Sequence, residues 1–138
     1  MKLLLDTHIW LWADLEPRRL PAWVATALAA PENELWLSPL SGWELAQLCG
    51  KGRLQLDRPW REWLTESVRA ERLRDAALSL PVVAATAEVR VPHRDPVDWL
   101  LAATARHYEL ALVTLDRHLL AGSGFARLAP PALRRGPY

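Results

Sequence analysis

The sequence predicts an α/β fold in which a central, mainly parallel sheet of four to five strands is flanked by helices. The chain begins with an uninterrupted apolar run, residues 3–5, that stops abruptly at Asp6. Such a run suits a strand that is covered on both faces, as in a parallel sheet. Further short apolar runs alternate with longer helical patterns, and this alternation is typical of a parallel sheet with helices on both sides.

Each expected strand ends at a clear turn or helix signal. Residues 34–37 (ELWL) are followed by Ser38 and a proline, which end a strand and begin a helix. Pro81 ends the apolar run at 76–80, and Asp116 closes the run at 110–114. The expected strands are residues 3–5, 34–37, 76–80, 110–114 and, as a short edge strand, 125–128.

The expected helices begin at capping residues or prolines and end at helix breakers. Asp6 or Thr7 can cap the first helix, Pro21 opens the second, and Gly50 stops the third. Asp95, which precedes a proline, opens a later one. The expected helices are residues 8–14, 21–30, 40–49, 59–73, 82–89 and 95–108, with one helical turn at 117–120.

The length and cysteine content are those of a one-domain protein from a reducing compartment. We expect residues 1–130 to form the domain and residues 131–138 to form a short mobile tail. The single Cys49 excludes an internal disulfide. Apolar runs are far shorter than the ~18 residues that cross a bilayer, and Lys2 precedes only a short apolar run, unlike a signal peptide. We therefore expect a cytoplasmic protein without membrane contact.

Four carboxylates occupy comparable places near strand ends and helix starts. Asp6 follows the first strand, Asp116 follows the fourth, Asp98 lies in the first turn of a helix, and Glu44 lies inside another. Because the carboxyl ends of parallel strands lie along one edge of a sheet, we expect these acids to lie close together. Clustered acids repel each other, and a divalent cation removes that cost. Oxygen ligands without a cysteine or histidine cluster favour Mg²⁺, with Mn²⁺ as a substitute.

Most of these acids also have a purely structural interpretation. Asp95 suits the N-cap of its helix, and Asp98 suits the first turn, where an acid favours the helix dipole. Asp6 and Asp116 can each cap a short helix that follows them. Glu44 is the hardest to explain in this way, because it lies on an apolar helix stripe with no basic residue within four positions.

Four segments together resemble the motifs of a known family. They are LLLDTHIWLWA (3–13), LSPLSGWELAQL (37–48), HRDPVDWLLAATA (93–105) and LVTLDRHL (112–119). On these motifs the chain resembles the PIN-domain ribonucleases, and specifically the toxins of VapBC type II toxin–antitoxin modules. The resemblance implies a PIN-like three-layer fold, Mg²⁺-dependent endonucleolytic cleavage of RNA, homodimerisation, and inhibition by a small cognate VapB-type antitoxin.

The same resemblance assigns site residues. It places the family's catalytic and metal-binding acids on Asp6, Glu44, Asp98 and Asp116. Asp95 matches an additional acid of this branch, and Thr114 matches a hydroxyl used beside the metal site. One departure is Trp99, where this branch often has arginine. This removes a cation next to the site and bears on substrate or antitoxin contacts rather than on the chemistry.

A hydrolytic mechanism follows as a hypothesis. One or two Mg²⁺ ions among the quartet would stabilise the charge that builds on a phosphodiester, with Glu44 either as a ligand or as the acceptor of the attacking water's proton. Arg94, Arg117 and His118 adjoin the acids in sequence and are candidates for contacting RNA phosphates. The alternative is that they are solvated surface side chains. His8 either faces the site or packs in the core.

Two other functions fit part of the pattern. A receiver-like Mg²⁺-binding signalling domain also places acids at strand ends, but it needs a lysine at a late strand end, and neither Lys2 nor Lys51 is placed there. A non-catalytic interaction module would have the fold without the metal, and the full acidic quartet argues against it.

The eight tryptophans suggest both a core and a contact surface. Trp36 and Trp43 are expected in the core. Four others lie on two amphipathic helices and either pack in the core or line a groove that receives an antitoxin helix: Trp10, Trp12, Trp60 and Trp63.

Overall fold

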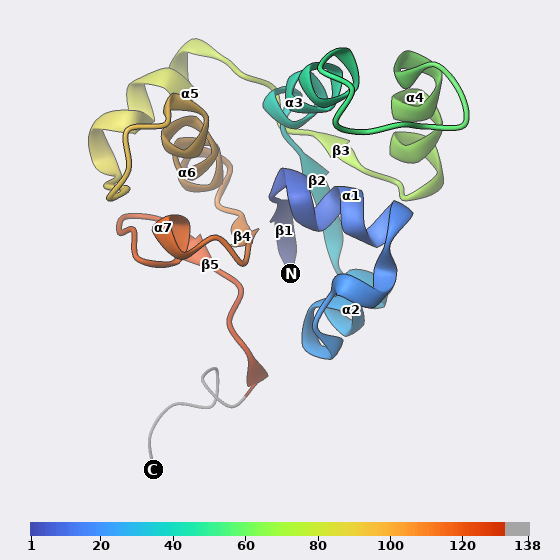
Figure 1. Cartoon of the computed structure of the whole chain (residues 1–138). Coiled ribbons are helices and arrows are strands. Elements are labelled where there is room, and N and C mark those ends of the chain that lie inside the picture. The colour runs from blue at the N-terminus through green and yellow to red at the C-terminus, as the bar shows by residue number, and fades with distance from the viewer. Residues whose placement is uncertain (132–138) are drawn as a thin grey trace.

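The computed structural model describes residues 1–131 as a three-layer α/β fold (Figure 1). Five parallel strands form one sheet in the order β3-β2-β1-β4-β5. The predicted fold class is thereby confirmed. The strands are β1 (Lys2–Leu5), β2 (Glu34–Leu37), β3 (Arg74–Asp75), β4 (Ala111–Val113) and β5 (Ala126–Arg127).

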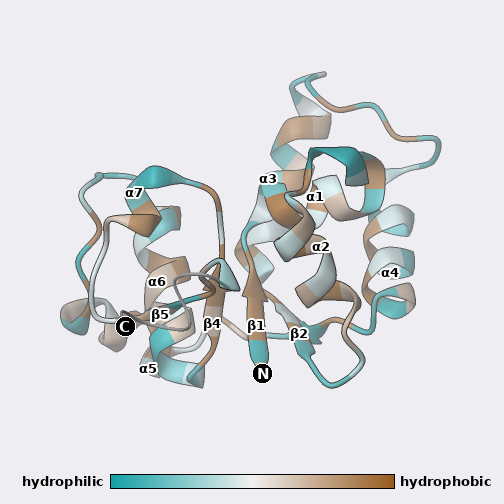
Figure 2. Cartoon of the chain, turned by 90° about the horizontal axis from the view of Figure 1, so that it is seen from below, coloured by the Kyte–Doolittle hydropathy of each residue, from teal (hydrophilic) through white to brown (hydrophobic). Residues whose placement is uncertain are grey.

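Helices cover both faces of the sheet (Figure 2). One side carries α1 (Thr7–Leu15), the 3-10 turn η1 (Pro17–Arg19), α2 (Ala22–Ala29), α3 (Pro39–Gly50) and α4 (Trp60–Ala70). The other side carries α5 (Leu80–Ala85), the 3-10 turn η2 (Thr86–Glu88), α6 (Pro96–Tyr108) and α7 (Arg117–Leu120). Within residues 1–131, every helix is too short or too polar to span a bilayer.

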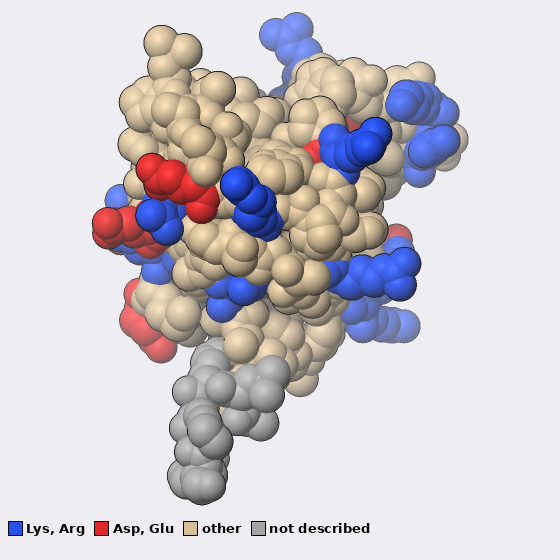
Figure 3. All heavy atoms as spheres, turned by 90° about the vertical axis from the view of Figure 1, so that its left-hand side faces the viewer, with Lys and Arg blue, Asp and Glu red and all other residues tan. Residues whose placement is uncertain are grey.

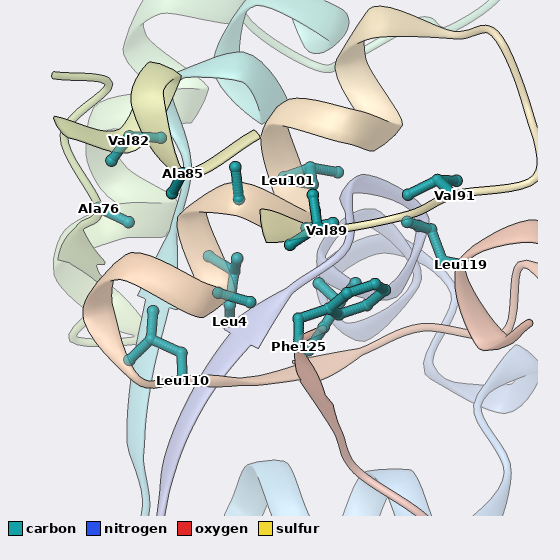
Figure 4. Close-up of a cluster of buried hydrophobic side chains, with 14 residues drawn as sticks. Leu4, Ala76, Val82, Ala85, Val89, Val91, Leu101, Leu110, Leu119 and Phe125 are labelled. Atoms are coloured by element: carbon teal, nitrogen blue, oxygen red, sulfur yellow. The ribbon is translucent and has the colours of Figure 1, made fainter. Parts of the chain in front are cut away.

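Strand β1 divides the interior into two hydrophobic cores. Successive side chains of a strand point to opposite faces, so Leu3 and Leu5 pack among α1 to α4, whereas Leu4 packs on the other side. Leu4 meets Val89, Leu101 and other side chains of the α5–α7 layer (Figure 4). The uninterrupted apolar run therefore serves both cores at once.

The pairing of the two central strands positions the acids at one edge. Leu5 of β1 pairs with Val113 of β4, and the N–H of Asp6 donates to the carbonyl of Val113 at 3.0 Å. The residues that follow, Asp6 and Thr114, are therefore neighbours across the end of the sheet. Because β2 and β4 lie on opposite sides of β1, this edge is a topological switch point, where open α/β sheets bind ligands.

The third strand differs from the prediction. It lies at Arg74–Asp75 rather than at residues 76–80. Only Ala76 continues the pairing, through its N–H to the carbonyl of Leu37 at 2.9 Å. Beyond it the chain leaves the sheet, because Ser79 caps α5 with its side chain and a proline follows in the first turn. The helix therefore begins two residues earlier than expected, at Leu80 rather than at residue 82.

Several helix boundaries and two tryptophans also differ from expectation. The expected helix 82–89 is α5 followed by η2, and the expected helix 59–73 ends at Ala70. Trp43 is 55% exposed rather than in the core, because α3 turns Ser41 and Leu45 inward and Trp43 lies two residues from each. Trp36 is half-buried and packs against the ring of Tyr108.

The proposed groove residues divide into two groups. Trp10 and Trp63 are buried, with ring centroids 5.4 Å apart, so for these two the groove interpretation is wrong. Trp12 and Trp60 are half-buried. Of the expected tail, residues 132–138 lie outside the described residues, and the division into a domain and a tail stays a prediction.

Candidate active site

Asp6 is the buried centre of the acidic cluster. It follows β1 and is 9% exposed. Its Oδ1 accepts the N–H of Thr7 at 2.8 Å, and its Oδ2 accepts the hydroxyl of Thr114 at 2.7 Å. Burial raises the pKa of Asp6 above its ordinary value, the two hydrogen bonds oppose that rise, and the charge of Asp116 adds to it.

Thr114 links Asp6 to Asp116. Its hydroxyl donates to Asp6 and accepts the N–H of Asp116 at 3.0 Å. The Asp116 side chain then caps α7, since its Oδ1 accepts the N–H groups of His118 at 2.8 Å and Leu119 at 3.3 Å. The capping and the site interpretations of Asp116 are therefore compatible, because the cap uses only Oδ1 of its carboxylate.

Glu44 reaches the cluster through Thr7. The Thr7 hydroxyl lies 2.5 Å from Oε1 of Glu44 and 2.8 Å from the hydroxyl of Ser41 on the same helix, α3. Burial is the largest cause that raises the pKa of Glu44, and the charges of Asp6 and Asp95 raise it further. An inward carboxylate on a helix without a basic partner is thus accounted for by a polar contact and by its place in the cluster.

Asp98 lies in the first turn of α6, beside a histidine from the preceding loop. Its Oδ2 is 3.2 Å from Nδ1 of His93. Asp95 caps the same helix by accepting the N–H of Val97 at 2.9 Å, which confirms the expected N-cap. Burial, followed by the charges of Asp95, Asp116 and Asp6, raises the pKa of Asp98 to about 6.

These couplings place five carboxylates in one region of the molecule. The pKa of Asp98 responds to three other acids, and that of Glu44 responds to two. Such effects need short separations. Hydrogen bonds through Thr7 and Thr114 connect Asp6 to Glu44 and to Asp116.

The tightest metal-competent group is not the quartet itself. Among residues 1–131, the ligand atoms that all lie within 4.8 Å of one another are those of His93, Asp95 and Asp98. Asp6, Glu44 and Asp116 are not members of this group. The donor set is mainly carboxylate oxygen with one imidazole, and this fits a hard divalent cation such as Mg²⁺ or Mn²⁺.

His93 was missed by sequence reasoning. The sequence signal was slight: a histidine two residues before the N-cap Asp95, in a segment expected only to be a loop. Its position depends on contacts from elsewhere in the chain. The indole N–H of Trp99 donates to the carbonyl of His93 at 2.6 Å. The His93 ring stacks on the ring of His118, with centroids 4.4 Å apart.

The predicted phosphate-contacting residues lie on the rim. Arg94 and Arg117 are exposed. Neither guanidinium forms a hydrogen bond or a salt bridge with another residue among residues 1–131. His118 is half-buried, with Nδ1 3.6 Å from Oδ1 of Asp116. On the face carrying α5 to α7, basic side chains form several separate patches rather than one continuous surface (Figure 3). A role in binding phosphate stays a prediction for all three residues.

The family model of the PIN domain matches residues 3–123 of this chain. The chain belongs to the PIN-domain family. It is also 39% identical over 120 residues, 85% of this chain and 88% of the other, to ribonuclease VapC22 from Mycobacterium tuberculosis. The family that the motifs indicated is thereby confirmed.

Solved structures agree on the PIN fold. VapBC2 from Rickettsia felis, crystallised with a DNA fragment from its promoter, matches with a TM-score of 0.68 at 17% identity, covering 93% of this chain and 98% of that one. FitAcB from Neisseria gonorrhoeae matches with a TM-score of 0.56 at 23% identity, covering 92% and 96%. At these identities the matches show the fold alone.

Proposed function

We propose that this PIN-domain protein is a Mg²⁺-dependent endoribonuclease that acts in the cytoplasm as the toxin of a VapBC-type module. The carrying observation is the pair of carboxylates that follow β1 and β4, Asp6 and Asp116, which Thr114 joins by two hydrogen bonds. The similarity to a protein named as a ribonuclease supports RNA as the substrate. The fold alone hosts many functions, so the acidic site carries the chemistry.

The proposed roles follow from the contacts of each acid. Asp6, Asp98 and Asp116 hold the divalent ion, which when bound activates water and stabilises charge on the phosphate. Glu44 is a ligand or accepts the proton of the attacking water, and its Thr7 contact fixes its direction. Thr114 positions Asp6 and Asp116 relative to each other.

A cleavage assay with site variants tests the activity. The wild-type chain should cut a fluorescently labelled RNA in Mg²⁺ or Mn²⁺ and lose this activity in EDTA. Asp98→Asn should reduce cleavage by at least two orders of magnitude, because the amide cannot replace a charged ligand. Glu62→Gln, which alters an exposed acid on α4, is the matched control and should cleave like wild type.

One outcome would contradict the assignment of Asp98, and another would contradict the nuclease itself. Full activity of Asp98→Asn would remove Asp98 from the site. A folded wild-type protein that neither binds Mn²⁺ nor cuts RNA would favour the non-catalytic interaction module. Thermal melting of each variant shows whether loss of activity reflects loss of fold.

The antitoxin is proposed to cover an apolar cleft between α3 and α4. The cleft has a volume of about 440 Å³ and is lined by apolar side chains that include Trp43, Trp60 and Leu64. An amphipathic helix inserting apolar anchors is the usual occupant of such a groove. One structure with a similar fold, from Klebsiella pneumoniae, is described as a toxin–antitoxin complex. Trp43→Ala should weaken antitoxin binding in calorimetry and leave RNA cleavage unchanged.

Homodimerisation is part of the same proposal. Light scattering coupled to gel filtration should give twice the 15.6 kDa mass of one chain. A concentration-independent mass of one chain would show that the dimer is not formed without the antitoxin.

A further inference from the structure

A small pocket opens beside the acids. Its volume is about 160 Å³, and its lining combines two carboxylates with apolar and aromatic side chains: Asp6, His8, Ile9, Trp12, Leu115 and Asp116. The lining comes from α1, which follows β1, and from the segment that joins β4 to α7 (Figure 1). The pocket therefore shares two walls with the candidate metal site.

The aromatic wall is held in a fixed arrangement. His8 and Trp12 lie four residues apart on α1, and their rings stack with centroids 5.9 Å apart and planes inclined by 29°. Arg19 places its guanidinium carbon 4.4 Å from the centroid of the Trp12 ring, and Trp12 packs against the core below. The wall is preorganised, which lowers the entropy cost of binding a ligand against it.

Core packing does not account for this wall. His8 is exposed, and Leu115 is 37% exposed. Apolar and aromatic surface thus faces water directly beside charged carboxylates. The described residues that line the pocket include no lysine or arginine to bind an anion, and their aromatic and apolar side chains suit a neutral planar group. Its volume is below the range of about 300–1,000 Å³ typical of sites for whole small molecules, so it suits a single ring system.

We propose that this pocket receives one unpaired base of a single-stranded RNA, next to the phosphate that is cut. The proposal rests on the nuclease function proposed above. Unstacked bases of single-stranded RNA bind by stacking on aromatic side chains. A base inside a duplex is already stacked and paired and does not enter the pocket. The substrate is accordingly single-stranded around the cleavage position.

Binding measurements on an inactive background test the pocket. In Asp98→Asn protein with Mn²⁺, the anisotropy of fluorescein-labelled RNA reports affinity for a random single-stranded 12-mer pool and for a 12-base-pair duplex. Trp12→Leu keeps an apolar side chain without an aromatic face, whereas Trp12→Phe keeps one. Trp23→Leu, at a tryptophan of α2 that is half-buried like Trp12 and does not line the pocket, is the matched control.

Trp12→Leu should weaken single-strand binding about 10-fold, in line with the loss of one base-stacking contact. Trp12→Phe and Trp23→Leu should stay within about twofold of the parent, and duplex binding should be weak and unchanged. Wild-type affinity of a folded Trp12→Leu protein would overturn the pocket while leaving the nuclease intact. The base pocket would also be overturned if Trp12→Leu weakened duplex binding as much as single-strand binding, or if it weakened only antitoxin binding. A parent protein that binds no RNA would overturn both proposals.

Discussion

Thr114 connects the acid that follows β1 to the acid that follows β4. A single hydroxyl donates to Asp6 and accepts from the backbone of Asp116. Thr114 is 1% exposed, so water cannot easily replace either of the two contacts that its hydroxyl oxygen makes. The spacing of the two acids therefore depends on this side chain.

Thr114→Val should show how much the two hydrogen bonds of this hydroxyl contribute to stability. The substitution keeps the shape and leaves a buried N–H and a buried carboxylate oxygen without a partner, which costs about 1–3 kcal/mol of unfolding free energy. Urea unfolding followed by circular dichroism measures this cost. Thr114→Ser keeps the hydroxyl and should lose clearly less. Thr65→Val, at an exposed threonine of α4, is the matched control, and an equal loss there would contradict the assignment.

Asp98 should make the metal-free protein less stable as the pH rises. Its pKa in the fold is about 6, against 3.8 as the ordinary value. The folded state therefore binds this proton more tightly than the unfolded chain does, so the stabilisation is present below about pH 4 and is lost between about pH 4 and pH 6. In EDTA, Asp98→Asn should raise the melting temperature more at pH 7.5 than at pH 4.5. An equal shift at both pH values would contradict the raised pKa.

At the level of elements, α6 begins where capping and site geometry coincide. Asp95 caps the helix through Val97, and Asp98 follows in the first turn. The loop before it is fixed by a two-way backbone bridge between Arg90 and Ser123, with both N–H to O distances at 2.9 Å. The entry to the helix is thus held from a distant part of the chain.

Asp95 allows the cap and the charge to be tested apart. Asp95→Ala removes the cap and should cost about 1 kcal/mol of unfolding free energy. Asp95→Asn keeps a good capping side chain and should cost little in the metal-free protein. If Asp95 supports the ion, Asp95→Asn should still bind Mn²⁺ more weakly in calorimetry. Unchanged Mn²⁺ affinity in the Asn variant would leave Asp95 with the cap alone.

Sequence reasoning reached the site where local signals suffice. Asp6 was placed correctly because an apolar run and a polar stop mark the end of β1, and Asp95 because a proline follows it. His93 was not found, since its ring stacks on that of His118, which lies far from it in the sequence. The prediction misplaced strand β3 because a strand of two residues is too short to show a hydrophobic periodicity. The sequence does not distinguish it from the extended chain on either side.

At the scale of the whole molecule, β1 is shared by both cores. Leu4 is fully buried in one core, and Leu3 is fully buried in the other. Few residues of so short a strand could be changed without affecting the packing on both sides. We therefore expect the two helical layers to unfold together rather than in turn.

Leu4→Ala tests this shared core. Removing a fully buried leucine side chain should cost about 2–5 kcal/mol, whereas Leu80→Ala, at a residue 84% exposed, should change stability by less than about 0.5 kcal/mol. Tryptophan fluorescence mainly follows the layer of α1–α4, which carries six of the eight tryptophans, and far-ultraviolet circular dichroism follows the whole chain. The two transitions should coincide, and separate midpoints would show independent layers.

The strand order also decides when the acidic cluster is first complete during synthesis. Strand β1 leaves the ribosome first, yet one of its two neighbours in the sheet is β4. The hydroxyl of Thr114 and the carboxylate of Asp116 join Asp6 only after β4 has emerged. A nascent chain that stops before residue 114 has no assembled cluster. We therefore expect the proposed nuclease to become competent only once four of its strands have been translated.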